Sequence, residues 1–188
     1  MSLTKEKIVA NATKYFATAE KQGFATPELQ DFLGLDFVGA PASTQLKYGN
    51  AFEGGLVDHI LRVMRIAYKI NETLESQQVP IASLIKTVYL YQIGKAKMFT
   101  PKLSSWHNER GIMYDFNEDL SPMRTGERSI YYCIKAGIEL SEDEYVAILN
   151  HDKSDDLQAE HHNNDLGTLL VIANKLAINQ EKALVNAD

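Results

Sequence analysis

Residues 54–74 read GGLVDHILRVMRIAYKINETL and carry the clearest helical signal in the chain. Apolar side chains recur along one face of the predicted helix, at Leu56, Ile60, Val63, Ala67, Ile70 and Leu74. His59 lies three residues after Leu56 and four before Val63, so it belongs to that same face. We therefore expect His59 to be buried and satisfied by polar contacts in the core.

Further helices are predicted on both sides of this segment. They are expected at about residues 5–21, 27–34, 81–93, 126–137, 142–151 and from 166 onward. Thr26-Pro27 supplies a hydroxyl N-cap followed by proline at the first helical position. Ser141 and Glu144 have the spacing of a capping box, which predicts a helix starting at Glu142. The sequence thus predicts a mostly α-helical protein.

Residues 98–124 interrupt the helical pattern. The stretch SSWHNERGIMYDF, residues 104–116, alternates aromatic and polar side chains on either side of a glycine, Gly111. This pattern predicts a small β-hairpin insertion around residues 104–117. Trp106, Tyr114 and Phe116 are expected to pack onto the helices; the alternative is that they form an interaction surface for a partner.

The bulk properties favour one domain spanning residues 1–188, with a helical extension at 1–44 and a core at 45–180. Hydrophobic content of 45% and charged content of 23% are ordinary for a globular protein. The net charge of −6 argues against broad nucleic-acid binding, which depends on Lys and Arg contacts to phosphates. Cys133 is the only cysteine, so a disulfide framework or thiolate metal cluster is excluded.

No apolar run reaches the ~18 residues that would span a bilayer, and the N-terminal segment lacks the apolar core of a secretory signal. We expect a cytoplasmic protein with no membrane partner.

Five segments stand in a recognisable order along the chain. They are FEGGLVDH (52–59), IGKA (93–96), GERS (126–129), LSEDEYVAILNH (140–151) and LLVIANKLA (169–177). Together they resemble the HD-domain phosphohydrolase superfamily, most closely its small bacterial and phage-type members, over roughly residues 45–180. The resemblance implies a helical bundle whose inward histidines and aspartates hold one or two divalent metals. Such metals polarise a phosphoryl oxygen and activate water for attack.

Most of the metal-ligand positions that the resemblance implies hold other residues here. Histidine is kept at His59 and His151. The adjacent His-Asp pair falls on Tyr91-Gln92, the histidine before Gly-Glu-Arg-Ser on Thr125, and the aspartate of the last helix on Asn174. These degenerate positions lack the carboxylates that would offset a cation's charge. We therefore expect no catalytic residue, no metal and no cofactor; a metal, if bound, would use His59 and His151.

A ligand pocket without a metal is the next hypothesis. Its candidate residues are His59, Gln92, Lys95, Arg128 and His151. If Lys95 and Arg128 face one cleft, they could bind a phosphorylated ligand. The alternative is that Arg128 pairs with a carboxylate of the bundle and Lys95 lies in solvent.

The function expected from these observations is that of a catalytically degenerate HD-domain protein. It would bind a protein partner or a nucleotide-like ligand; self-association into a homo-oligomer stays open. The alternative is a metal-dependent phosphohydrolase that acts on nucleotides or phosphorylated small molecules through an atypical site, built from His59, His151 and carboxylates of a polar loop. That loop, HDKSDDLQAEHH at 151–162, contains Asp152, Asp155, Asp156, His161 and His162. The two interpretations of this segment are an ordinary polar loop on the surface and a relocated metal site.

Overall fold

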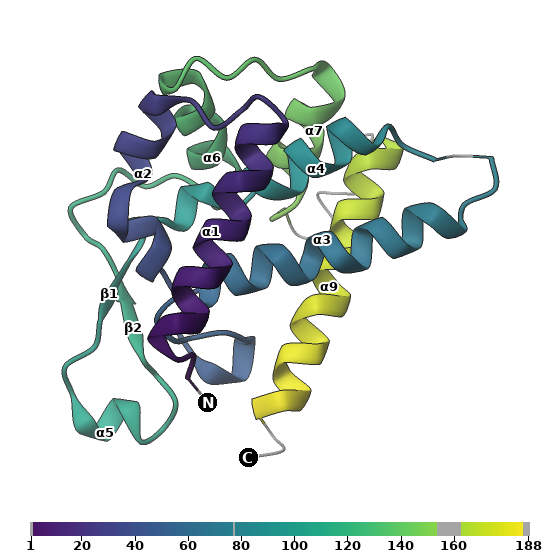
Figure 1. Ribbon diagram of the computed structural model, residues 1–188. Helices are drawn as coiled ribbons and strands as arrows, with labels where there is room; N and C mark the ends of the chain where they lie inside the picture. Colours follow the sequence, from purple (N-terminus) through teal and green to yellow (C-terminus); the bar gives the residue numbers. More distant parts are fainter. Residues whose placement is uncertain (1, 77, 154–162, 186–188) are drawn as a thin grey trace.

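The elements that surround residues 54–74 are mostly helices, as predicted, joined by one small antiparallel sheet (Figure 1). The computed structural model describes residues 2–76, 78–153 and 163–185. The α-helices in these ranges are α1 (Lys5–Lys21), α2 (Pro27–Gly39), α3 (Gly55–Thr73), α4 (Ile81–Leu90), α5 (Ser105–Asn108), α6 (Thr125–Lys135), α7 (Glu142–Asn150) and α9 (Asp165–Val185). Two 3-10 turns, η1 (Leu46–Tyr48) and η2 (Ile93–Lys95), and two strands, β1 (Phe99–Pro101) and β2 (Tyr114–Phe116), complete the described elements.

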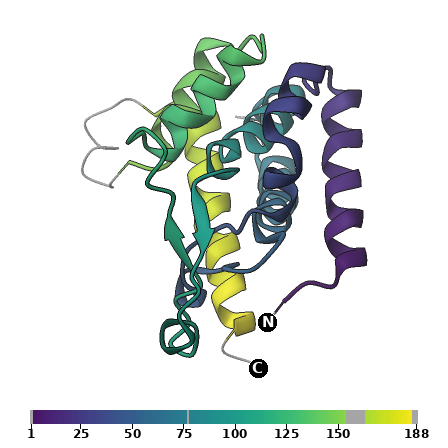
Figure 2. The same cartoon turned by 90° about the vertical axis from the view of Figure 1, so that its left-hand side faces the viewer.

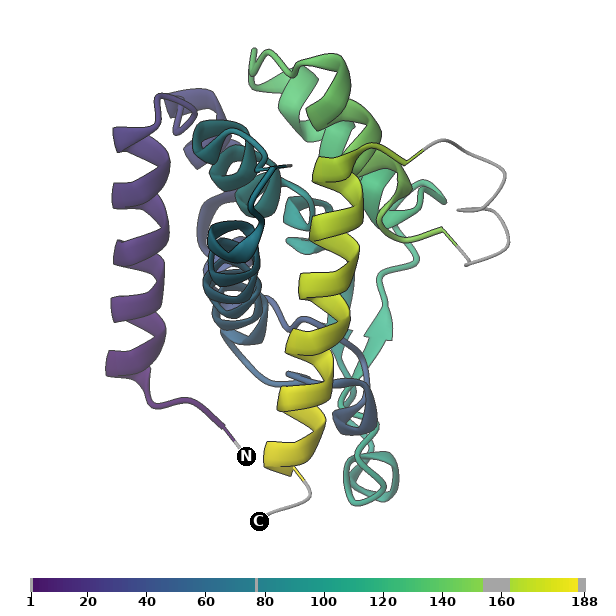
Figure 3. The ribbon, with the colours of Figure 1, turned by 90° about the vertical axis from the view of Figure 1, so that its right-hand side faces the viewer.

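Helix α3 runs through the middle of the molecule. Helix α1 packs on one side of it and α9 on another, so that α1 forms an outer layer (Figures 2 and 3). Helices α6 and α7 pack on each other, and α7 also packs on α9. The start of α1 and the end of α9 lie at the same end of the molecule. Helices α1, α2, α4 and α9 all pack on α3, and α3 and α9 carry three of the polar side chains described below, His59, Asn174 and Glu181.

Helix α1 contributes directly to the core. The Tyr15 side chain is fully buried, its hydroxyl donates to the Tyr89 carbonyl at 2.7 Å, and its ring stacks on that of Tyr89. Thr4 caps the helix by accepting from the Lys7 backbone amide. Residues 1–44, expected as an extension, therefore share their core with the later helices.

Two helix ends differ from the prediction. Helix α2 was expected to stop near Gly34; instead Gly34 adopts φ 54° and ψ −152°, which kinks the chain before helical residues resume up to Gly39. Glycine tolerates this conformation because it has no Cβ. Helix α4 ends at Leu90, and residues Ile93–Lys95 form a separate 3-10 turn.

The predicted β-hairpin is present, but its strands lie further from the turn than expected. Strands β1 and β2 pair antiparallel, with Phe99 opposite Phe116 and Pro101 opposite Tyr114. Residues Ser105–Asn108, which the alternating pattern assigned to a strand, form the short helix α5. The Ser104 carbonyl accepts from the backbone amides of His107 and Asn108, so this segment satisfies its own backbone rather than pairing across the hairpin.

Strands β1 and β2 and helix α5 form an arm that projects from the helices (Figures 1 and 2). Trp106 is 54% exposed and Phe116 66% exposed, so the expectation that they pack onto the helices is wrong. Tyr114 is partly buried. Within the described ranges, none of the helices combines the length and the apolar character that crossing a bilayer requires.

Candidate functional site

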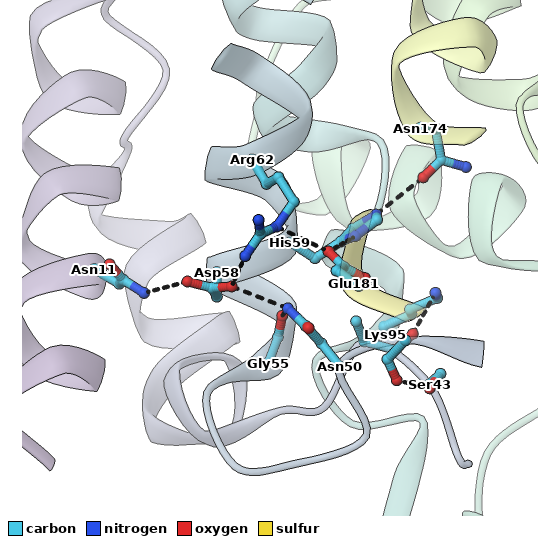
Figure 4. A network of polar contacts seen from close by, with 12 residues as sticks. Asn11, Ser43, Asn50, Gly55, Asp58, His59, Arg62, Lys95, Asn174 and Glu181 are labelled. Atoms are coloured by element: carbon cyan, nitrogen blue, oxygen red, sulfur yellow. Dashed lines mark hydrogen bonds and ion pairs between the residues drawn. The ribbon is translucent and has the colours of Figure 1, made fainter. Parts of the chain in front are cut away.

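A buried polar cluster centred on His59 joins α3, α4 and α9. His59 is 2% exposed and both of its ring nitrogens have partners (Figure 4). Its Nδ1 lies 2.8 Å from Oε1 of Glu181. Its Nε2 lies 2.8 Å from the Tyr91 hydroxyl and 2.9 Å from Oδ1 of Asn174. His59 is therefore buried and hydrogen-bonded, as expected.

The hydrogen bonds leave no lone pair of the His59 ring free. Because Nδ1 faces a carboxylate, it carries a proton and donates to Glu181. In a neutral ring, Nε2 then accepts from the Tyr91 hydroxyl. In a doubly protonated ring, Nε2 instead donates to Asn174. In either state, Nε2 is unavailable as a metal ligand.

Tyr91 fills the space between the two histidines that the sequence keeps. Its ring centroid lies 4.8 Å from that of His151 and 6.4 Å from that of His59. Burial, together with the Glu181 carboxylate, raises the pKa of its hydroxyl well above the usual range, so the group stays protonated. Its backbone carbonyl accepts from the Ser129 hydroxyl of α6 at 2.8 Å, which fixes the end of α4.

His151 sits at the C-terminal end of α7 and is 7% exposed. Its Nδ1 donates to the Ile148 carbonyl at 2.7 Å. Burial lowers the pKa of the ring to about 4, against the opposing effect of the neighbouring Asp152. His151 is therefore a neutral imidazole packed edge-on against Tyr91.

Glu181 extends the cluster toward the surface. Its Oε1 also lies 3.5 Å from Arg62 Nε, and Arg62 contacts Asp58 at 3.2 Å. Asp58 accepts in addition from the side-chain amides of Asn11 and Asn50, at 3.1 and 3.0 Å (Figure 4). Two carboxylates and one guanidinium thus bind α1, α3 and α9 to one another.

Glu181 and Asp58 were not among the predicted site residues. Glu181 is 1% exposed, although glutamate is almost never fully buried unless it is paired. The signal was its spacing: Glu181 comes four residues after the buried Ala177 and seven after Asn174, on the same face of α9. Asp58 immediately precedes His59 in the sequence. Its partners Asn11 and Asn50 come from other segments of the chain, so the local sequence did not reveal its role.

Gln92 and Lys95 are placed next to the cluster but outside its hydrogen bonds. Gln92 is 4% exposed, and its Oε1 has no hydrogen-bond partner in the part of the chain that the structure describes. Lys95 does not lie in solvent: its ammonium donates to the Ala42 carbonyl at 2.7 Å. Burial lowers the pKa of Lys95 to about 8, partly offset by the carboxylates of Glu181 and Asp152.

Arg128 has a different hydrogen-bond partner from Lys95. It is 6% exposed and donates from NH2 to the Ser121 carbonyl. The described contacts of Arg128 include no carboxylate, so the expected ion pair is not seen among them. Lys95 does not line the cavity beside Arg128, so the described residues show no cleft that the two share. Thr125 begins α6, and the next amide, that of Gly126, donates to Asp152 at 3.1 Å.

The residues present do not fit the metal centre that the resemblance implies. The Nε2 atom of His59 faces Tyr91 and Asn174, and the Tyr91 ring separates it from His151. In the described ranges, no group of three or more His, Cys, Asp or Glu side chains is arranged to hold a metal ion. Asp155, Asp156, His161 and His162, from the proposed relocated site, lie outside the described residues.

Comparison with known proteins adds no relative to these observations. No protein-family model matches the chain, and neither a curated protein nor a solved structure is similar to it.

Proposed function

We propose that this chain is a non-catalytic binding domain with an HD-domain-like scaffold. One observation carries the proposal: the Nε2 atom of His59 meets the Tyr91 hydroxyl at 2.8 Å and the Asn174 amide at 2.9 Å. Three positions at which the resemblance implies metal ligands thus contact one another. In this chain these three side chains contact one another at hydrogen-bond distance instead of binding a cation.

The other nitrogen of His59 supports the same proposal. Histidines that bind metals almost always donate their second ring N–H to a carboxylate, a backbone carbonyl or water. The Nδ1–Glu181 hydrogen bond has that arrangement. The pair is what a former metal-binding histidine would keep once tyrosine and asparagine had replaced the metal.

The remaining positions also gather around Tyr91. Its ring contacts His151, and its backbone carbonyl contacts Ser129 of the Gly-Glu-Arg-Ser segment. That segment packs tightly on α7, since a Cβ added to Gly126 would lie 2.4 Å from the Ile148 carbonyl oxygen. The segments that carry the resemblance are therefore neighbours in space, as a common ancestral site would require.

Binding would then use the surface rather than the buried cluster. A cavity of about 490 Å³ lies between the end of α2, residues 96–97 and the two strands, with Phe99 and Tyr114 in its lining. Its charged residues are Asp36, Glu53 and Lys97, and Lys97 already contacts Asp36 at 3.7 Å. Two carboxylates against one lysine disfavour a phosphate there, so of the two ligand classes we favour a protein partner over a nucleotide.

The test is a metal titration combined with an activity screen. Purified protein is mixed with Mn²⁺ or Zn²⁺, its melting temperature and bound metal are measured, and hydrolysis of nucleoside mono- and triphosphates and cyclic nucleotides is assayed. We expect no bound metal and no turnover. Metal-dependent hydrolysis that disappears in the variant His59→Ala would overturn the proposal and establish the phosphohydrolase alternative.

A further inference from the structure

A small cavity lies beside the start of α6, apart from the His59 cluster. Its volume is about 250 Å³. Apolar side chains supply most of its lining, namely Met98, Phe116, Leu120, Pro122 and Met123. Arg128 also lines it and is the only charged residue among the described residues of the lining. This differs from the larger cavity beside Tyr114, where two carboxylates are present.

The guanidinium of Arg128 has unused hydrogen-bond donors. Arg128 is 6% exposed, so its charge is largely removed from water. Arginine carries five N–H donors, and the described contacts of Arg128 use only NH2, which donates to Ser121. Its Nε is buried and has no hydrogen-bond partner among the described residues, and none of the described ion pairs includes Arg128. A buried cation without a counter-charge is costly, and an anion in the adjacent cavity would remove that penalty.

The lining selects the kind of anion. A guanidinium fork matches the two oxygens of a carboxylate. A phosphate dianion would call for further donors, but Lys95 donates to the Ala42 carbonyl and is not part of this lining. The methionine, leucine and phenylalanine side chains suit an apolar body, and the volume limits that body to a small one.

We infer that this cavity binds a small monocarboxylate with an apolar body, such as an arylalkanoate or a short alkanoate. The carboxylate pairs with Arg128, and the hydrocarbon part lies against Met98 and Met123. The inference does not rest on the loss of the metal site, because Arg128 makes none of the described contacts of the His59 cluster.

The experiment is an NMR titration of protein labelled at its methionine methyl groups. Met98 and Met123 are two of the five methionines, and Met64 of α3 serves as an internal reference. The probe is 3-phenylpropanoate, and its matched controls are the neutral 3-phenylpropanamide and inorganic phosphate. We expect saturable shifts at Met98 and Met123 with a Kd on the order of 1 mM for a ligand of this size. The amide should bind at least roughly tenfold more weakly, because it lacks the charge.

Two variants test the role of Arg128. Arg128→Gln removes the guanidinium, and Met123→Glu places a tethered carboxylate at a position that is 38% exposed. Both should abolish the shifts at Met98. If Arg128→Gln fails to fold, Met123→Glu decides. The inference is overturned by absent shifts in the wild type, by equal binding of the amide, by tighter binding of phosphate, or by unchanged binding in Met123→Glu.

Discussion

Glu181 Oε1 lies 2.8 Å from Nδ1 of His59, and this contact joins the last turns of α9 to the first turns of α3, 122 residues earlier in the chain. Both side chains are almost completely buried. Arg62 approaches the same carboxylate oxygen at 3.5 Å. Removing the carboxylate therefore leaves the imidazole N–H without its acceptor and takes one of two carboxylates from Arg62, which keeps its contact with Asp58.

From this relationship we expect Glu181→Ala to destabilise the protein by about 3–5 kcal/mol, the usual range when one partner of a buried ion pair is removed. Urea unfolding followed by circular dichroism measures the change. Glu20→Ala, on the exposed face of α1, is the matched control and should change the free energy of unfolding by less than about 0.5 kcal/mol. Equal effects of the two substitutions would show that the buried pair does not stabilise the fold.

The Tyr91 hydroxyl should contribute through its hydrogen bonds alone. Tyr91→Phe keeps the ring that packs on His151 and removes the donor that faces His59 and Asn174. We expect a loss of about 1–3 kcal/mol, because buried polar partners are left unpaired. Tyr131→Phe, at a tyrosine that is 42% exposed, should be close to neutral. A neutral Tyr91→Phe would contradict the closed hydrogen-bond arrangement around His59.

His151 should make stability depend on pH in the acid range. Its pKa is about 4 in the folded protein and 6.5 for the ordinary side chain, so the unfolded chain binds more protons between these values. The free energy of unfolding should therefore fall as the pH drops from 6.5 to 4, by at most roughly 3 kcal/mol. The neighbouring charges also act on this pKa: Asp152 raises it, and Lys95 and His59 lower it.

His151→Asn isolates this contribution, since the asparagine amide can still donate to the Ile148 carbonyl but does not titrate. Unfolding curves at a series of pH values should show a smaller slope between pH 4 and 6.5 in the variant than in the wild type. Parallel slopes would mean that His151 is not buried as a neutral ring.

The close approach of α6 to α7 gives a prediction about glycine. A Cβ at Gly126 would lie 2.4 Å from the Ile148 carbonyl oxygen, so Gly126→Ala should destabilise the fold by about 1–3 kcal/mol. Gly39, at the end of α2, has only Glu53 Cγ near the same position, at 3.9 Å. Gly39→Ala should therefore be neutral, or stabilising by up to about 1 kcal/mol. Thermal unfolding compares the two, and a harmless Gly126→Ala would contradict the packing of these helices.

Restoring the implied ligands tests the positional correspondence with HD-domain proteins. The changes are Tyr91→His, Gln92→Asp, Thr125→His and Asn174→Asp, made together. We expect the combined variant to bind Zn²⁺ or Mn²⁺, seen as bound metal and a raised melting temperature, because imidazoles and carboxylates would again converge. Adding His59→Ala should remove that binding. A folded variant that binds no metal would show that the correspondence is mistaken.

Much of the helical architecture was predictable because each long helix buries one face. The stripe from Leu56 to Leu74 identified α3, and the capping box identified the start of α7. The hairpin was predictable in kind but not in register, because alternation in SSWHNERG does not distinguish a strand from a short helix that starts at Ser105.

The site residues were only partly predictable, because some of them depend on partners from distant segments. His59 and Asn174 were named because they interrupt apolar faces or fall on implied ligand positions. Glu181 was missed because a glutamate near the end of a sequence is ordinarily solvated, and only the arrival of Arg62 and His59 from α3 makes its burial favourable. Such partners depend on the packing of α3 against α9, which local patterns do not encode.

The two α9 partners of His59 also determine how far that helix can slide. Asn174 and Glu181 are seven residues apart, which is a rise of about 10.5 Å along a helix. They contact the two different nitrogens of the same imidazole ring, Nε2 and Nδ1. A shift of α9 by one turn along α3 would break both hydrogen bonds at once and bring an apolar residue against a ring that has lost its acceptors. The contacts of His59 therefore fix the register of α9 relative to α3 and hold the last helix at a single axial position in the bundle.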